Sequence, residues 1–192
     1  MVNEPEWRTG RLLQIFHANH CAMKPVPRQL GARFSPTCLL VSRRRTPYNR
    51  RVTGLGILFV CIGNSCRSPM AEAIARRLGS PDVEAHSAGL APTGWVAEHT
   101  LTTLESLGYS SEGLWSKGLE AVPTDEIDVV VSLLGRDAFD VLPLPAGARR
   151  EAWSILDPFG EDEEVYVGVA RRLEARIRRL LEEELGRELP IS

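Results

Sequence analysis

The chain lacks several features that would place it in other classes of protein. Its 192 residues contain no apolar run near the ~20 residues that a membrane-spanning helix requires. Four cysteines are too few for a disulfide scaffold in a chain of this length, and none follows Cys66. Hydrophobic residues make up 43% of the chain. We therefore expect a soluble protein with one globular domain and an appendage, and no membrane partner.

The formal net charge of −2 conceals two oppositely charged segments. Residues 1–54 contain ten basic and two acidic residues, a net charge of +8, whereas residues 55–192 contain thirteen basic and twenty-three acidic residues, a net charge of −10. The basic segment is rich in proline and shows no sustained hydrophobic periodicity. We predict that residues 1–54 form a largely disordered, dispensable extension, and an ordered protein that starts near Val52 is one form of this hypothesis.

Three other interpretations of residues 1–54 stay open. The basic residues suit an acidic surface or nucleic acid, but interleaved aromatic residues are missing, so we expect no nucleic-acid partner. The segment also has the composition of a transit peptide. His17, His20, Cys21 and Cys38 are candidate metal ligands, but their spacing matches no paired-ligand pattern, and we expect no metal.

Apolar strand patterns alternate with helical patterns after residue 54. Helices are expected over residues 69–78, 96–107 and 163–185, and strands over 55–60, 83–88, 127–133 and 151–156. This alternation predicts an α/β fold, a three-layer sandwich in which a four-stranded parallel sheet has helices on both faces. We assign residues 55–187 to this domain and 188–192 to a C-terminal tail. A site is expected at the carboxyl edge of the sheet, beside the first strand.

The first predicted strand leads into a loop that carries a thiol and a guanidinium. This Cys61 loop consists of Cys61, Ile62, Gly63, Asn64, Ser65, Cys66, Arg67 and Ser68. Because unpaired N–H groups at the start of a helix attract anions, the loop is a candidate phosphate cradle. Gly63 is expected to supply backbone freedom, and Arg67 to grip two phosphate oxygens. The same field favours the thiolate of Cys61, to which Ser68 can donate a hydrogen bond.

A Cys-x5-Arg pattern alone is weak evidence, because Cys38 and Arg44 repeat the spacing. That second copy has no glycine between them and no helix after it. Only the Cys61 copy stands between a predicted strand and a predicted helix, which is the context that the motif requires.

The Cys61 loop, together with His86-Ser87-Ala88-Gly89 and Leu156-Asp157-Pro158-Phe159-Gly160, resembles the low-molecular-weight protein tyrosine phosphatase family. The resemblance covers roughly residues 55 to 187. It implies that Cys61 attacks phosphorus and forms a cysteinyl-phosphate, that Arg67 holds the equatorial oxygens, and that Asp157 protonates the leaving oxygen. It further implies that Asn64 organises the loop and Ser68 assists the thiolate. No cofactor is implied, and a reactive thiol favours a reducing, cytoplasmic compartment.

Asp157 is also interpretable from its neighbours. Asp157-Pro158 stands between a predicted strand and the last predicted helix, so its carboxyl is expected at the same sheet edge as Cys61. There it can act first as an acid and then as a base that activates water. The alternative is an aspartate that only forms the turn.

The substrate has three candidates. Phosphotyrosine in proteins is the first, and phosphoarginine is the second, because the arginine-directed branch resembles this chain in having a small hydroxyl residue at Ser65. The third is arsenate, reduced with an external thiol since no cysteine follows Cys66 to relay a disulfide. A non-catalytic domain that binds phosphorylated partners is the alternative outside the enzymes. The oligomeric state stays open.

Two further groups of residues have alternative roles. Cys66 either forms a reversible disulfide with Cys61 that protects the nucleophile, as the family resemblance implies, or packs as a small buried side chain. Phe159 is the single aromatic residue after Asp157-Pro158. Trp95 or Trp115 either completes an aromatic wall with it, or is part of the partial core or a loop anchor.

Overall fold

The computed structural model describes residues 54–136, 139, 142 and 147–190. The predictions made for the N-terminal extension, including the candidate ligands His17, His20, Cys21 and Cys38, lie outside the described residues. None of the described helices combines the length and the apolar character needed to cross a membrane.

Four parallel strands form the sheet of the described part. They are β1 (Leu55–Cys61), β2 (Val83–Gly89), β3 (Val129–Ser132) and β4 (Arg149–Ala152), in the order β2-β1-β3-β4. β1 pairs with β2 on one side and β3 on the other, and six of its seven residues are buried. An apolar strand covered on both faces is what the run 55–60 predicted.

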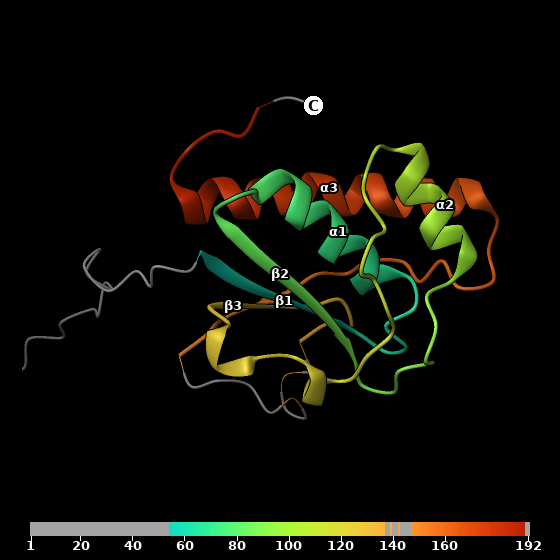
Figure 1. The fold of residues 1–192 in the computed structure, drawn as a ribbon, viewed down its shortest axis with the longest axis horizontal. Coiled ribbons are helices and arrows are strands. Elements are labelled where there is room, and N and C mark those ends of the chain that lie inside the picture. Colours follow the sequence, from blue (N-terminus) through green and yellow to red (C-terminus); the bar gives the residue numbers. More distant parts are fainter. Residues whose placement is uncertain (1–53, 137–138, 140–141, 143–146, 191–192) are drawn as a thin grey trace, which may run out of the picture. The chain divides into compact units, whose positions relative to one another are not determined.

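Three α-helices of the described part lie together on one face of the sheet (Figure 1). They are α1 (Arg67–Gly79), α2 (Glu98–Ser106) and α3 (Glu163–Leu185), and α1 packs against β1, β2 and α3. The other face is covered in part by two 3-10 turns, η2 (Leu119–Ala121) and η3 (Thr124–Glu126), and the residues beside them. The predicted α/β fold with a four-stranded parallel sheet is confirmed, and in the described part the helical segments on the second face are 3-10 turns.

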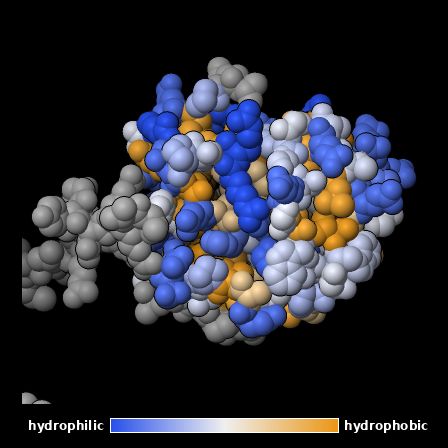
Figure 2. Space-filling view, in the orientation of Figure 1, coloured by the Kyte–Doolittle hydropathy of each residue, from blue (hydrophilic) through white to orange (hydrophobic). Residues whose placement is uncertain are grey.

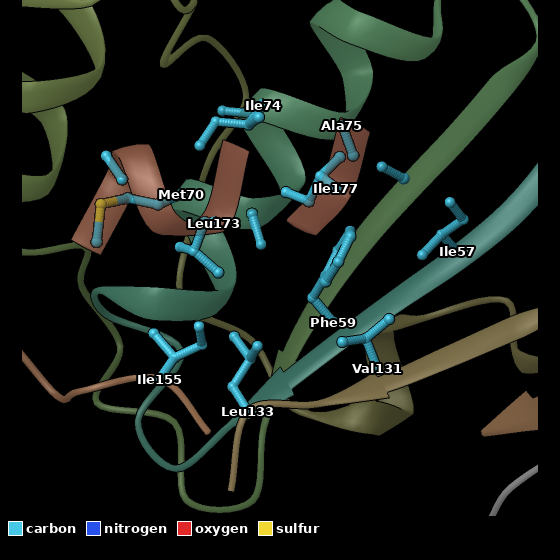
Figure 3. Close-up of a cluster of buried hydrophobic side chains, with 14 of the residues drawn as sticks. Ile57, Phe59, Met70, Ile74, Ala75, Val131, Leu133, Ile155, Leu173 and Ile177 are labelled. Atoms are coloured by element: carbon cyan, nitrogen blue, oxygen red, sulfur yellow. The ribbon is translucent and has the colours of Figure 1, made fainter. Parts of the chain in front are cut away.

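The alternation of β1 side chains divides the core into two clusters. Ile57 and Phe59 join α1 and α3, as Figure 3 shows, whereas Leu58 and Val60 join the cluster on the opposite face. Phe59 also contacts Trp153, with ring centroids 6.0 Å apart. Because both faces of β1 are packed, the end of this strand is a rigid base for the loop that follows.

The long helix was predicted correctly, with α3 spanning Glu163–Leu185. Its predicted core face is buried in full, and the residues are Tyr166, Val169, Leu173, Ile177 and Leu180. Gly186 ends the helix with a φ of 65°, a left-handed conformation that favours glycine. Leu189, which we expected in the tail, is 6% exposed and packs with the core.

The fourth strand was predicted in the wrong place. β4 covers 149–152 instead of 151–156, because its only partner strand in the described part, β3, ends at Ser132. The last pairing contact is the hydrogen bond of 2.8 Å from the Trp153 amide to the Ser132 carbonyl. Within the described residues no strand pairs further with 153–156, although Trp153 and Ile155 remain buried. The apolar run therefore marked burial, and the strand itself begins with two exposed arginines.

Candidate active site

The Cys61 loop joins β1 to α1. Several of its backbone carbonyls are hydrogen-bonded to neighbouring segments, whereas most of its backbone amides are unpaired in the described part of the chain. The carbonyls of Ile62, Gly63 and Ser65 accept hydrogen bonds of 2.9 to 3.0 Å from the amides of Ala91, Thr93 and Ala97, respectively. Among the described residues, no acceptor bonds the amides of residues 63–67. With its carbonyls held by the scaffold and its N–H groups unpaired, the loop has the polarity of an anion-binding nest.

The left-handed residue of the loop is Asn64, with a φ of 46°. The expectation that Gly63 adopts a conformation forbidden to side chains was therefore wrong. A Cβ at Gly63 would instead lie 3.1 Å from Cγ2 of Thr93, so the glycine allows close approach of the neighbouring segment. Asparagine tolerates the left-handed region better than most residues, and the hydrogen bonds of its side chain hold it there.

Asn64 is fully buried and connects the loop to α1, to β2 and to the segment before η2. Its Nδ2 donates to Ser68 Oγ and to Ser87 Oγ, each over 2.8 Å, and its Oδ1 accepts from the Lys117 amide over 2.7 Å. Ser68 Oγ in turn lies 2.9 Å from the sulfur of Cys61. Because Asn64 occupies one acceptor position of Ser68, the Ser68 proton can point toward the sulfur, which is closer than the alternative acceptor, the Ala88 carbonyl at 3.4 Å.

Arg67 and Asp157 meet at the carboxyl edge of the sheet. Nη2 of Arg67 forms an ion pair with Oδ2 of Asp157, and Nη1 donates to the Leu133 carbonyl over 3.2 Å. The guanidinium is buried, with Nε unpartnered among the described residues, whereas the Asp157 side chain is 46% exposed. The structure thus brings Asp157 beside the loop that carries Cys61, as predicted from the Asp-Pro turn.

Sequence reasoning missed a charged group beneath the loop. Glu72 of α1 is fully buried, and its Oε2 accepts from Ser87 Oγ and from Lys117 Nζ, the latter over 3.1 Å. Its Oε1 pairs with Arg76. A signal existed, since Glu72 interrupts the apolar run from Met70 to Ala75. We call Asn64, Ser68, Glu72, Ser87 and Lys117 the buried polar cluster.

Cys66 lies on the core side of the loop, 4% exposed, with its sulfur 3.5 Å from the Tyr166 hydroxyl. Burial raises the pKa of the Cys66 thiol, and the hydrogen bonds from Tyr166 and Thr100 offset this only in part. Cys66 therefore stays a protonated thiol near neutral pH. Both Cys61 and Cys66 are free in the structure.

The large hydrophobic side chains that the described part exposes gather around the same edge. Five of them follow β1, β2 or β4, and the sixth precedes Lys117. We call these residues the apolar rim: Ile62, Leu90, Trp95, Trp115, Leu156 and Phe159. Trp95 and Phe159 contact each other with ring centroids 6.2 Å apart, and both are more than half exposed. The face in view in Figure 2 is a mixture of hydrophilic areas and separate hydrophobic patches.

Trp115 is 55% exposed, and its ring lies 5.4 Å from Nζ of Lys117. Neither Trp95 nor Trp115 is therefore part of the core, and Trp95 is the one that adjoins Phe159. The described residues contain no group of three or more histidine, cysteine or acidic side chains arranged to hold a metal ion.

Comparison with known proteins identifies relatives along the same region. The profile of the family described as low molecular weight phosphotyrosine protein phosphatase matches residues 56–190. A glutaredoxin arsenate reductase of Synechocystis sp. is 34% identical over 128 residues, which cover 65% of this chain and 95% of the relative. A protein-arginine-phosphatase of Bacillus subtilis is 30% identical over 141 residues, covering 66% of this chain and 94% of the relative.

A solved structure agrees with the fold. The YwlE arginine phosphatase from Geobacillus stearothermophilus aligns with a TM-score of 0.61 and 30% sequence identity. The alignment covers 69% of this chain and 94% of that structure.

Proposed function

This chain is a cysteine-based enzyme that belongs to the low molecular weight phosphotyrosine protein phosphatase family, and we propose that it removes phosphoryl groups from phosphorylated proteins. The observation that carries the proposal is the Cys61 loop itself. Its amides from 63 to 67 are unpaired within the described residues, Ser68 contacts the sulfur of Cys61, and Asp157 pairs with Arg67. Nucleophile, anion receptor and acid thus occupy one sheet edge.

In the first step the Cys61 thiolate attacks phosphorus, and the bond to the leaving oxygen breaks. The free amides and the planar fork of Arg67 hold the three equatorial oxygens, whose charge is redistributed in the transition state. The incoming phosphate competes with Asp157 for Nη2 of Arg67. Asp157, released from this ion pair, takes up a proton from solvent and donates it to the leaving oxygen.

In the second step the cysteinyl-phosphate is hydrolysed. Asp157, now a carboxylate, accepts a proton from water as the water attacks phosphorus, and the Cys61 thiolate leaves. The Ser68 hydroxyl, oriented by Asn64, donates to the sulfur and stabilises it as a leaving group. The chemistry needs a reduced thiol, which suits the cytoplasmic compartment that we predict.

Phosphotyrosine is the substrate class we propose first. Trp95 and Phe159 present two tilted, exposed rings beside the loop, and an aromatic ring that carries phosphate gains stacking and apolar contacts there. The apolar rim as a whole suits a protein segment with apolar residues around the phosphorylated one. A small inorganic oxyanion such as arsenate would use none of this surface.

Phosphoarginine is the second candidate, and Ser65 favours it. Ser65 is 3% exposed, and its Oγ has no hydrogen-bond partner among the described residues. A hydroxyl available in the loop suits a polar substrate group, where an aliphatic side chain would exclude it. The relatives named as arginine phosphatases support this candidate, and those named as arsenate reductases support arsenate with an external thiol.

The experiment compares kcat/KM of the full chain for a phosphotyrosine peptide, for a phosphoarginine peptide, and for arsenate with glutathione or mycothiol. We expect the phosphotyrosine peptide to have the largest value. A larger value for phosphoarginine selects the second candidate, and preferential arsenate reduction contradicts both protein substrates. The Cys61→Ser variant is the control, and equal turnover by this variant would end the assignment at this site.

A further inference from the structure

The buried polar cluster contains two charged side chains, and their burial costs desolvation free energy. Glu72 is fully buried and Lys117 is 7% exposed, and removing such charges from water is unfavourable unless they are paired. The ion pair of Glu72 and Lys117 is surrounded by further polar groups. Lys117 Nζ contacts Oε2 of Glu72 at 3.1 Å, and lies 3.5 Å from both Ser87 Oγ and the Trp115 carbonyl.

The hydrogen bonds of this cluster lead in one direction toward Cys61. The carboxylate of Glu72 can only accept, so Ser87 donates to it and must accept from Nδ2 of Asn64. The second Nδ2 hydrogen of Asn64 goes to Ser68, so the Ser68 proton is available for the sulfur at 2.9 Å, and the alternative acceptor, the Ala88 carbonyl, lies farther away at 3.4 Å. The amide of Lys117 fixes which way the Asn64 side chain faces, because it donates to Oδ1.

The charges act on the sulfur as well. A buried carboxylate near a thiolate repels it, and the repulsion is cancelled only if a cation accompanies the carboxylate. Lys117 and Arg76 are the cations that contact Glu72, and the Arg76 side chain is 41% exposed, so solvent screens it more. His86 of β2 also faces this cluster, but burial lowers its pKa, so it is uncharged near neutral pH.

We propose that Lys117 is a positioning residue for the reaction at Cys61. Its ammonium neutralises Glu72, and its amide orients Asn64, so that Glu72 sets the direction of the hydrogen bonds without opposing the thiolate. This inference rests on the proposed function, in which Cys61 is the nucleophile. The charged or titratable groups around Cys61 itself are Arg67 of α1, Asp157 of the loop between β4 and α3, and the neighbouring thiol Cys66.

The test uses Lys117→Met, which keeps the aliphatic stem and removes the charge, and the double variant Glu72→Gln with Lys117→Met, which removes both charges. Alkylation of Cys61 by iodoacetamide is followed against pH in the full chain, with the modified peptide identified by mass spectrometry. We expect the pH midpoint of alkylation to rise by about one unit in Lys117→Met, a tenfold loss of rate at pH values below both midpoints. In the double variant the midpoint should return to within about 0.3 units of the parent, a twofold change in rate.

An unchanged midpoint in Lys117→Met would overturn the proposal. So would a shift that persists in the double variant, because a shift caused by a packing defect at residue 117 does not depend on the charge of residue 72. If Lys117→Met does not fold, Glu72→Gln alone decides, since it leaves Lys117 uncompensated and should lower the midpoint. An unchanged or raised midpoint there contradicts the inference. Failure of the proposed function is distinguishable, because Cys61 of the parent would then not alkylate faster than Cys66 at neutral pH.

Discussion

The Cys61 loop separates two regions of opposite character. The buried polar cluster places charged and amide groups where a protein normally has a hydrocarbon core, and the apolar rim exposes large hydrophobic side chains that a protein normally buries. Each region by itself lowers the stability of the folded protein. Their adjacency indicates that the inner region prepares the sulfur and the loop, whereas the outer region contacts what the loop receives.

This division predicts different kinds of loss on substitution. Changes in the loop and the groups bonded to it should lower kcat for every substrate, because they act on the reacting atoms. Changes in the apolar rim should alter KM and the ranking of substrates, because they act on the rest of the substrate.

The largest effect is expected for Arg67→Lys. A lysine keeps the charge but cannot hold two oxygens in a planar fork, so kcat/KM for p-nitrophenyl phosphate should fall by about 10³-fold. Steady-state kinetics measures it, with Arg77→Lys, an exposed arginine of the same helix, as the matched control. Equal losses in both variants would mean that the bidentate grip of Arg67 is not used.

Asp157→Asn should have the next largest effect, and the loss should depend on the leaving group. We expect kcat for a phosphotyrosine peptide to fall by about 10²-fold, because an amide cannot donate the required proton. p-Nitrophenolate leaves without protonation, so the first step should be affected less with p-nitrophenyl phosphate in single-turnover measurements. Glu161→Gln, which removes an exposed charge from the same loop, is the control. The same loss for both substrates would argue against an acid role.

The sequence predicts those parts of the site whose residues are close together along the chain, and it misses contacts between residues that are far apart along the chain. Cys61, Arg67 and Ser68 lie within one strand, loop and helix, so local patterns identified their placement, and the turn chemistry of Asp157 identified its edge of the sheet. The link from Glu72 to Lys117 spans 45 residues and depends on tertiary contacts that no local period encodes. The left-handed conformation of Asn64 was missed for the same reason, because two of the three partners that hold it, Ser87 and Lys117, are distant in the sequence.

The fold, too, was predicted well where local sequence defines an element and poorly where a distant partner defines it. α3 was predicted to the residue, since a long amphipathic period and a terminal glycine define a helix locally. The bounds of β4 depend on where β3 stops, so the apolar run at 153–156 was mistaken for the strand. The strand pairing predicted there was wrong, although Trp153 and Ile155 are buried.

A moderate effect is expected in the apolar rim. Trp95→Ala combined with Phe159→Ala should raise KM for a phosphotyrosine peptide about tenfold and leave kcat for p-nitrophenyl phosphate within about twofold. The Phe159→Leu variant distinguishes the contribution of aromatic contacts from that of apolar surface area, because leucine keeps much of the apolar area but has no ring. A loss confined to kcat would contradict the division between the two regions.

The smallest effect concerns stability against pH. Burial lowers the pKa of His86 from its ordinary value of 6.5, and its Nε2 is buried without a partner among the described residues. The unfolded chain therefore binds more protons than the folded chain below that value, and the free energy of unfolding falls as the pH decreases through this window. Urea titrations from pH 7 to 5 should show a shallower decline in His86→Gln. A decline as steep as that of the parent would show that His86 does not contribute.

The most direct measurement of the central claim is the trapping of the cysteinyl-phosphate. The full chain is mixed with a phosphotyrosine peptide, quenched within the first turnover, and digested for mass spectrometry. We predict one phosphoryl group on the peptide that contains Cys61, absent from Cys61→Ser and longer-lived in Asp157→Asn. Turnover with no phosphorylated Cys61 at any quench time, or with the phosphoryl group on another residue, would contradict the account.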